Sequence, residues 1–240
     1  MNTVTGENRV CLFDTIRGFT IVSMVAFHTT YDLVYLYGCQ IPWFTVGPAQ
    51  ELWRISISWV FLSLAGWMTS LSRDNVRRAY LYSAAAFIIW VATTIASVDT
   101  PISFGILFCM AGSTWAWVLM KRTTSKTIER HPFMLSIFFI VTFLVFYRIP
   151  RHIYDVSGLA WLGFPSAGFS SGDYYPLIPF SFLYLAFSVL GNAWKQQGHT
   201  YPEWTYRNWC PVLSFIGTKS LPIYLLHQVA ILAVLQFILG

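Results

Sequence analysis

Charged residues are scarce in this chain of 240 residues. Asp, Glu, Lys and Arg make up 10% of it and hydrophobic residues 56%, whereas soluble domains carry ~25% charged residues. Such a chain would expose more apolar surface than water tolerates, so we predict an integral membrane protein. Its length suits one helical bundle, and we expect a single domain over residues 1–240.

Several motifs are also missing. The four cysteines (Cys11, Cys39, Cys109 and Cys210) lack the spacing of metal ligands, and we expect neither a metal site nor a disulfide. The sequence contains no HExxH pair and no GxxxxGK[ST] loop. We expect no retinal-type Schiff base either, because Lys219 lies at the start of the last apolar run rather than in its middle.

Apolar runs predict an all-α bundle of about seven transmembrane helices. They lie at 13–37, 52–71, 79–98, 102–120, 133–149, 176–194 and 220–239. Lys and Arg gather in the connections after the second, fourth and sixth runs and are rare in the others. The positive-inside rule therefore places the N-terminus in the cytoplasm. Topology thus explains the net charge of +5, and we expect no nucleic-acid partner.

Two long connections carry apolar or aromatic residues. The 150–175 connection is predicted to be outside, and its apolar patches indicate a lid or re-entrant segment on the outer mouth. The cytoplasmic 195–219 connection is rich in Trp and Tyr, which is typical of a segment at the membrane interface.

The first predicted span carries four ionisable residues: Asp14, Arg17, His28 and Asp32. At ~100° per residue they fall on one helix face, with Arg17 roughly 16 Å from His28 along the axis. Such residues persist in a membrane only when they face partners or a wet cavity. His28 is the candidate general base, and Asp32, one turn later, can orient its ring. The alternative is a structural hydrogen bond between helices.

Arg17 stays charged and can bind phosphate or carboxylate through its planar guanidinium group. Asp14 lies one turn before it, so a structural ion pair is the alternative. Gly18 would let another helix or a ligand approach closely. Arg73, Arg77 and Arg78, in the connection after the second span, are further candidates for holding a phosphorylated donor.

Two more spans place polar residues where apolar ones would suffice. Arg54 begins the second span and either contributes to a site or extends to the interface. Tyr224, His227 and Gln228 share one face of the last span. They can bind a polar substrate group or the oxyanion of an intermediate, or they can complete a hydrogen-bond network between helices.

The segment Phe13-Asp-Thr-Ile-Arg-Gly-Phe-Thr, with Met24 and His28, resembles the first span of heparan-alpha-glucosaminide N-acetyltransferase-like (DUF1624) proteins of the transmembrane acyltransferase superfamily. Arg17 and His28 also match the Arg/Lys-x10-His motif of the related acyltransferase-three family. Further similar stretches follow in order at 102–107, 173–179 and 220–228. The chain lacks the extra spans of larger members, and the lysosomal enzymes place their catalytic His elsewhere.

The resemblance implies a multi-pass enzyme of the bacterial cytoplasmic (inner) membrane. It would transfer an acyl group, commonly acetyl from acetyl-CoA, to a hydroxyl or amine of a sugar. The expected partners are acyl-CoA, a sugar or glycoconjugate acceptor and the bilayer. The oligomeric state is open, a homodimer being one alternative.

Two other functions remain as alternatives at this point. One is a small-molecule or proton-coupled transporter whose path follows the polar face of the first span, with His28 as a proton relay. The sequence shows neither the internal repeat nor the paired broken helices common in such transporters. The other is a membrane sensor or scaffold in which that polar face is structural.

Overall fold

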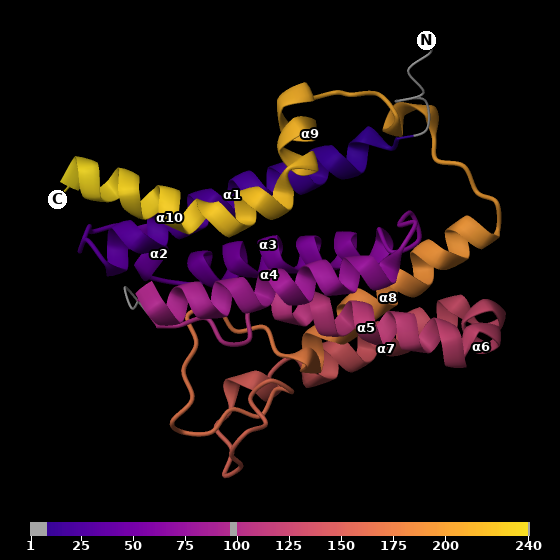
Figure 1. The fold of residues 1–240 in the computed structure, drawn as a ribbon, viewed down its shortest axis with the longest axis horizontal. Coiled ribbons are helices and arrows are strands. Elements are labelled where there is room, and N and C mark those ends of the chain that lie inside the picture. The colour runs from indigo at the N-terminus through magenta and orange to yellow at the C-terminus, as the bar shows by residue number, and fades with distance from the viewer. Residues whose placement is uncertain (1–8, 97–99, 240) are drawn as a thin grey trace. The chain divides into compact units, whose positions relative to one another are not determined.

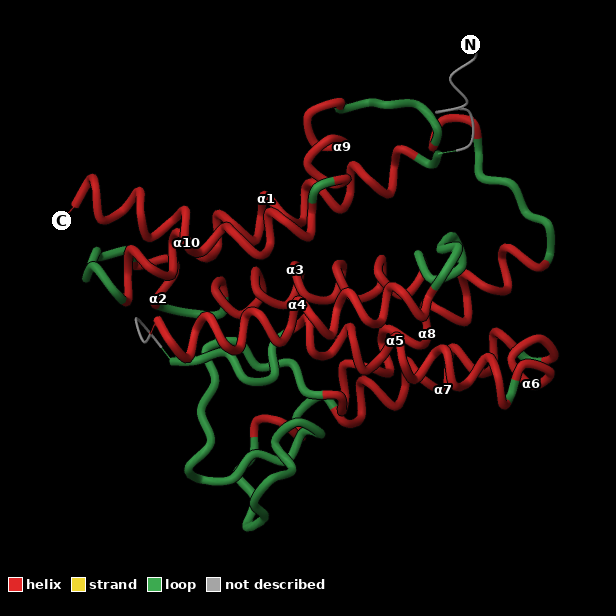
Figure 2. Tube along the Cα trace, viewed as in Figure 1, coloured by secondary structure: helices red, strands yellow, loops and turns green. Residues whose placement is uncertain are grey.

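The computed structural model describes residues 9–96 and 100–239, and that part of the chain is helical with no strand (Figures 1 and 2). The α-helices are α1 (Cys11–Tyr35), α2 (Pro42–Thr45), α3 (Ala49–Trp67), α4 (Asn75–Ala96), α5 (Ile106–Thr123), α6 (Ser125–Arg130), α7 (Pro132–Phe146), α8 (Leu177–Gln196), α9 (Pro211–Thr218) and α10 (Ser220–Leu239). Short 3₁₀ turns lie at Ile149–Arg151 and Glu203–Thr205. The predicted all-α fold class is confirmed.

Each predicted span coincides with a long helix over its described residues, residues 97 and 98 of the third span lying outside them. Five of these helices are long and apolar enough to cross a membrane. The five are Cys11–Tyr35, Asn75–Ala96, Pro132–Arg151, Leu177–Gln196 and Ser220–Leu239. The other two are α3 and α5, of 19 and 18 residues. Glu51 and Arg54 make α3 more polar, and Lys121 and Arg122 do the same for α5. The count of seven spans and the cytoplasmic N-terminus stay predictions.

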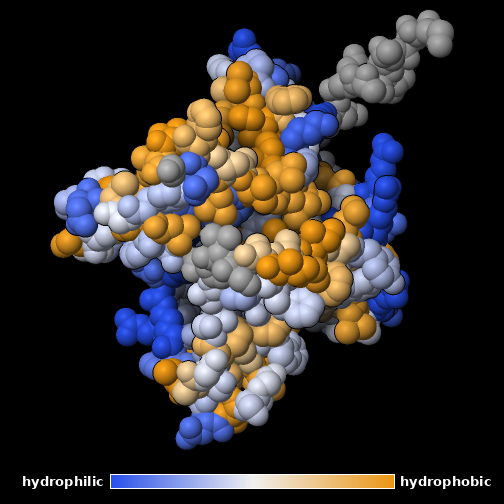
Figure 3. Space-filling view, turned by 60° about the vertical axis from the view of Figure 1, so that its left-hand side comes forward, coloured by the Kyte–Doolittle hydropathy of each residue, from blue (hydrophilic) through white to orange (hydrophobic). Residues whose placement is uncertain are grey.

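The helices expose apolar side chains, as a membrane protein does. Helix α7 has a broad exposed apolar face made of Phe133, Met134, Ile137, Phe138, Val141, Leu144 and Val145. Apolar side chains also cover much of the face drawn in Figure 3. This surface matches hydrocarbon better than water, so the composition and the structure agree that the chain is a membrane protein.

The chain forms two compact units. The first comprises the described residues up to Phe61 together with those from Thr200 onward, and the second comprises 62–199. Helix α3 runs from the first unit into the second. The single domain over 1–240 stays a prediction.

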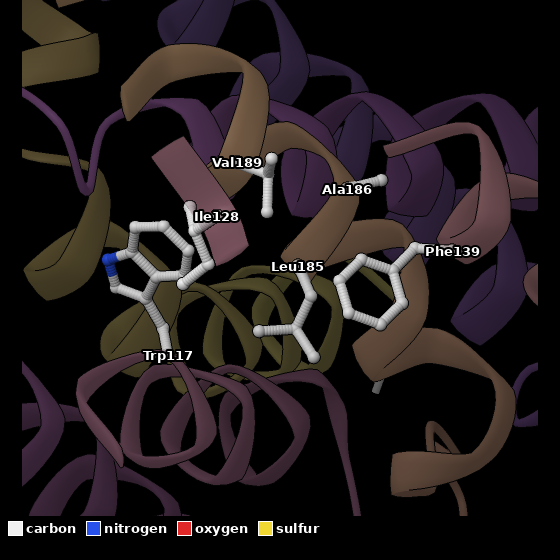
Figure 4. Close-up of a cluster of buried hydrophobic side chains, with 6 residues drawn as sticks. All are labelled: Trp117, Ile128, Phe139, Leu185, Ala186 and Val189. Atoms are coloured by element: carbon white, nitrogen blue, oxygen red, sulfur yellow. The ribbon is translucent and has the colours of Figure 1, made fainter. Parts of the chain in front are cut away.

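The second unit has its apolar core between α5, α6, α7 and α8 (Figure 4). The buried cluster contains Trp117, Ile128, Phe139, Leu185, Ala186 and Val189. A polar contact accompanies it, since the Ser136 hydroxyl donates to the carbonyl of Ala186 at 3.2 Å. The core therefore holds α8 at the centre of its unit, with small residues such as Ala186 allowing neighbouring helices to approach.

Within the first unit, α9 packs against α1, which the prediction of an interfacial segment did not include. Pro211 opens α9, a position where its missing N–H costs nothing. A Cβ added to Gly18 would lie 1.9 Å from the carbonyl oxygen of Leu213, and one added to Gly217 would lie 1.8 Å from that of Asp14. The two helices thus meet backbone to backbone. We expected either a helix or a ligand to approach Gly18 closely, and the structure shows the helix, α9.

The connection from 152 to 176 is mostly irregular (Figure 2), and it packs on the start of α5. The Asp173 carboxylate accepts a hydrogen bond from the Ile106 backbone N–H at 3.2 Å, and the Tyr175 N–H donates to the carbonyl of Phe104 at 2.8 Å. Two of the stretches that resemble the family, 102–107 and 173–179, therefore contact each other. The Tyr174 hydroxyl donates to the carbonyl of Ala160 at 2.7 Å, and burial raises the pKa of Tyr174 to about 12. That this connection covers an outer mouth stays a prediction.

Candidate functional site

Helix α1 runs unbroken for 25 residues and turns its ionisable residues toward the interior of the first unit. Asp14 and Asp32 are 3% and 2% exposed, values otherwise typical of apolar core residues. They alternate on one face with Gly18, Ile21 and other buried residues. Such burial of carboxylates requires partners: Gln228 of α10 supplies one for Asp32, and Arg9 and Arg17 bind Asp14.

His28 and His227 face each other between α1 and α10, with ring centroids 4.9 Å apart. The Nδ1 of His227 lies 2.6 Å from the carbonyl oxygen of Tyr224. Because a carbonyl only accepts hydrogen bonds, this Nδ1 carries the proton. In the neutral ring Nε2 then has a lone pair, and it is buried without a hydrogen-bond partner among the described residues. Two imidazoles, one with a free basic nitrogen, thus share this position.

Asp32 connects the same two helices. Its carboxylate accepts a hydrogen bond from Nε2 of Gln228 at 2.7 Å, across 196 positions of sequence. The polar residues of the two helices therefore form one group, called here the histidine cluster, which consists of His28, Asp32, Tyr224, His227 and Gln228. The structure brings together all the members that the sequence assigned to two separate spans.

Arg17 lies about three turns before His28 on α1. Its Nη1 is 3.5 Å from the Asp14 carboxylate and 3.4 Å from the carbonyl oxygen of Gly217 on α9. Arg9, which the sequence did not single out, binds Asp14 as well, and this hydrogen bond raises the pKa of Arg9. Asp14 thus carries two guanidinium partners, and the ion pair considered as an alternative for Arg17 is present.

Near the start of α3, Arg54 donates to the carboxylate of Glu51 at 2.7 Å. The preceding residue, Trp53, contacts α1, and its indole N–H donates to the Ser23 hydroxyl at 2.8 Å. We predicted neither of these two contacts from the sequence. Glu51 precedes Arg54 by three residues, a spacing that signals such a pair, whereas nothing in the sequence links Trp53 to Ser23.

The three arginines proposed for donor binding lie in the second unit. Arg73 and Arg77 are exposed. Arg78 is partly buried and donates to the carbonyl of Ala65 at 2.8 Å and to the hydroxyl of Tyr82 at 3.0 Å. The structure does not bring these arginines together with the histidine cluster in one unit. No group of three or more potential metal ligands occurs among the described residues.

A comparison with protein families adds the decisive observation. The family model described as heparan-alpha-glucosaminide N-acetyltransferase, catalytic, matches residues 9–229. The chain belongs to this family. The match includes both units, every member of the histidine cluster, and the contacting 102–107 and 173–179 stretches. Neither the curated proteins nor the solved structures give a match.

Membership confirms the predicted resemblance and indicates an acetyltransferase of the membrane. Acetyl-CoA is the donor that the family implies in general. The transporter alternative gains nothing from the comparison. The helices that present the histidine cluster, α1 and α10, are both long and apolar enough to cross a membrane.

Proposed function

We propose that this protein transfers an acetyl group from acetyl-CoA to a hydroxyl or amine of a sugar or glycoconjugate. The observation that carries the proposal is the pair of facing imidazoles, His28 and His227, on two membrane helices of a chain from an acetyltransferase family. Imidazole exchanges protons near neutral pH, as acyl transfer to a weakly acidic acceptor requires.

One proton passes from the acceptor to His28 and then from His28 to the leaving CoA, so His28 ends the reaction in its starting protonation state. His28 takes the proton of the acceptor O–H or N–H while the acceptor atom attacks the thioester carbonyl carbon. The tetrahedral intermediate then collapses, the C–S bond breaks, and the thiolate of CoA leaves with the proton from the imidazolium. Asp32, one turn from His28 and held by Gln228, stabilises the positive ring electrostatically.

The hydrogen bonds within the cluster limit the role of each remaining member. One of the two amide N–H groups of Gln228 donates to Asp32, and we assign Gln228 the role of holding that carboxylate in place. His227 donates through Nδ1 to a carbonyl, so in its neutral state it offers a proton acceptor at Nε2. When protonated, the same nitrogen becomes a donor for the oxyanion. Tyr224, whose ring centroid lies 5.6 Å from that of His227, is proposed as a further donor to the oxyanion.

The substrates are assigned from charge. Arg17, steadied by Asp14, and the basic residues Arg73, Arg77 and Arg78 are proposed to attract the phosphates of the donor. Arg54, paired with Glu51, is proposed to bind the hydroxyl-rich acceptor. The cytoplasmic membrane of a bacterium, with CoA on the cytoplasmic side, is the location consistent with these assignments, whether the protein is a monomer or a homodimer.

The test uses the full chain purified in detergent and reconstituted in nanodiscs. Acetyl-CoA labelled in the acetyl group is supplied with a panel of amino sugars and sugar alcohols, and labelled product is separated by chromatography. We expect a labelled sugar, or slow release of labelled acetate without acceptor, and neither with the His28→Ala variant. Intact acetyl-CoA under all conditions, together with uptake of a solute by proteoliposomes, would replace the proposal with transport.

A further inference from the structure

A second polar group lies in the second unit, where α3 ends, α4 begins and α5 and α8 end (Figure 1). It comprises Thr69, Lys121, Asn192 and Lys195, and it is called here the basic end. Lys121 Nζ donates to Oδ1 of Asn192 at 2.9 Å, and Lys195 Nζ donates to the carbonyl of Ser70 at 2.8 Å. Gly191, next to Asn192, lies against Trp67 and Ser70, so the segment after α3 and the end of α8 are in direct contact.

Buried polar atoms at the basic end have no partner. Asn192 is 8% exposed, and its Nδ2 makes no hydrogen bond to any described residue. Its orientation is fixed, because Lys121 requires an oxygen at the other amide position. Thr69 is 2% exposed, and its hydroxyl is likewise without a partner in the described chain. Folded proteins rarely leave two buried donors unsatisfied, so a missing acceptor is indicated.

The charges at this end point to the same conclusion. Lys121 and Lys195 donate hydrogen bonds only to neutral oxygen atoms, and Lys121 also lies over the ring of Trp117 at 6.0 Å from its centroid. No carboxylate pairs with either lysine in the part of the chain that the structure describes. The nearby carboxylates are exposed and otherwise engaged: Glu129 accepts from Gln196, and Asp74 accepts from the backbone of Arg77. One acceptor is also unsatisfied, the Oδ1 of Asn75, whose amide N–H is bound to the carbonyl of Thr69.

We infer that the basic end is a binding site for a phosphate group. Phosphate supplies acceptor oxygens for Nδ2 of Asn192 and the Thr69 hydroxyl, and its negative charge matches the two lysines. Lysine binds phosphate as a point charge, so its existing contacts with neutral oxygens can remain. A protonated phosphate oxygen or a ligand hydroxyl satisfies Oδ1 of Asn75. The inference rests on the proposed function in one respect: it takes the phosphates of the CoA donor as the occupant, with an anionic lipid headgroup as the other source of the same chemistry.

The experiment measures ligand binding rather than catalysis. Full-length protein in phosphatidylcholine nanodiscs is titrated with CoA, with 3′-dephospho-CoA and with pantetheine, which has no phosphate, and binding is followed by calorimetry. The variants are Lys121→Met and Thr69→Val, which keep side-chain volume, and Lys126→Met is the matched control because Lys126 is exposed at the end of the same helical hairpin. We expect CoA affinity to fall about fivefold to tenfold in the first two and to stay unchanged in the control. Pantetheine affinity should not change in any of them.

A parallel arm identifies the source of the phosphate. Nanodiscs with phosphatidylglycerol replace those with phosphatidylcholine, and lipid retained by the protein is counted by native mass spectrometry. If Lys121→Met and Thr69→Val lose bound phosphatidylglycerol but keep CoA affinity, the site binds a lipid phosphate. If neither ligand responds to either variant, and size-exclusion profiles show folded protein, the phosphate site is wrong.

The outcomes also separate this inference from the proposed function. Suppose that the wild type transfers acetyl groups and that Lys121→Met and Thr69→Val bind CoA and lipid normally. The acetyltransferase proposal would then stand, and the phosphate-site inference would be rejected. Loss of phosphate binding in these variants, with no acetyl transfer to any acceptor by the wild type, would retain the site and remove the acetyltransferase.

Discussion

The first unit and the basic end of the second unit differ in how their charged side chains are paired. In the first unit, Arg9 and Arg17 share the carboxylate of Asp14, and Arg54 is paired with Glu51. At the basic end, Lys121 and Lys195 rest on neutral oxygens. Internal pairing indicates groups held in position for a reaction or for folding. Cations without carboxylate partners are suited to receive an anion from outside the chain.

The contrast extends to unsatisfied buried atoms. In the histidine cluster the unpartnered atom described above is Nε2 of His227, a proton acceptor in the neutral ring. At the basic end the two unpartnered atoms considered for phosphate are donors, the amide of Asn192 and the hydroxyl of Thr69. An acceptor suits removal of a proton, whereas donors suit binding of an oxyanion. We therefore propose that the histidine cluster carries out proton transfer and that the basic end makes the larger contribution to phosphate binding, with a smaller one from Arg17.

Loss of an imidazole should have the largest effect. In the His28→Ala variant we expect acetyl transfer to fall at least ~100-fold, because the general base is removed while little packing is lost. His227→Ala should also reduce kcat, and the double variant should lose less than the sum of the single effects, since both rings serve one proton path. Single-turnover transfer and CoA calorimetry on all three variants provide the measurements.

The comparison between the units fails if either single variant keeps more than about a tenth of wild-type turnover. CoA affinity serves as the internal control, since no variant of the histidine cluster should alter binding at the basic end. A shared loss of CoA affinity would mean that one unit performs both tasks.

Much of the first unit could be predicted from sequence because its signals are local. Apolar runs predicted α1 and α10, and helical periodicity placed Asp14 and Asp32 on one face, which the structure shows to be buried. Spacing likewise put His227 and Gln228 together. That they meet α1 depends on packing between residues about two hundred positions apart, which no local pattern encodes.

Other features depend on contacts without a sequence signal. Helix α9 is eight residues long and lies in a segment whose Trp and Tyr content suggested an interface. Its place is set by the close approach of Gly18 and Gly217, a tertiary effect. The pairing of Lys121 with Asn192 spans 71 positions, and an Asn in an apolar helix has no distinctive pattern. The sequence therefore predicted the loop arginines Arg73, Arg77 and Arg78 as donor-binding residues and no member of the basic end.

The next largest effect is expected on stability, from a substitution that disrupts the backbone contact between α1 and α9. In Gly217→Ala the new Cβ would lie 1.8 Å from the carbonyl oxygen of Asp14, so the helices must separate. Overpacking of this kind costs about 1–3 kcal/mol of unfolding free energy. Thermal denaturation in detergent measures it, and Gly168→Ala is the matched control, because a Cβ at Gly168 meets nothing within 4 Å. Equal melting temperatures for the two variants would contradict the packing described here.

Substitution of Arg17 should weaken donor binding less than substitution of Lys121 does. Arg17 already has the Asp14 carboxylate at 3.5 Å, which competes with a phosphate, whereas Lys121 contacts a neutral amide oxygen. We expect Arg17→Ala to weaken CoA binding by no more than a few-fold, and Arg17→Lys to restore part of the loss because the planar guanidinium group matters. Calorimetry alongside Arg122→Ala, an exposed control, measures the difference. If CoA affinity in Arg17→Ala equals that of the wild type, Arg17 does not bind the donor. A larger loss than in Lys121→Met would reverse the comparison of the two units.

The smallest functional effect is expected from single cysteines that report topology. Ser157, in the 150–175 connection, and Thr124, between α5 and α6, are both exposed, so cysteines there should leave acetyl transfer unchanged. They are introduced into a variant whose partly exposed cysteines, Cys11, Cys39 and Cys210, are replaced by serine. An impermeant maleimide added to intact cells should label Ser157→Cys and not Thr124→Cys, because basic residues gather near the latter and predict a cytoplasmic location. Lysed cells, in which both react, are the control. The reverse pattern would put the basic end outside the cytoplasm, where CoA does not reach it, and its occupant would then be sought among lipid phosphates.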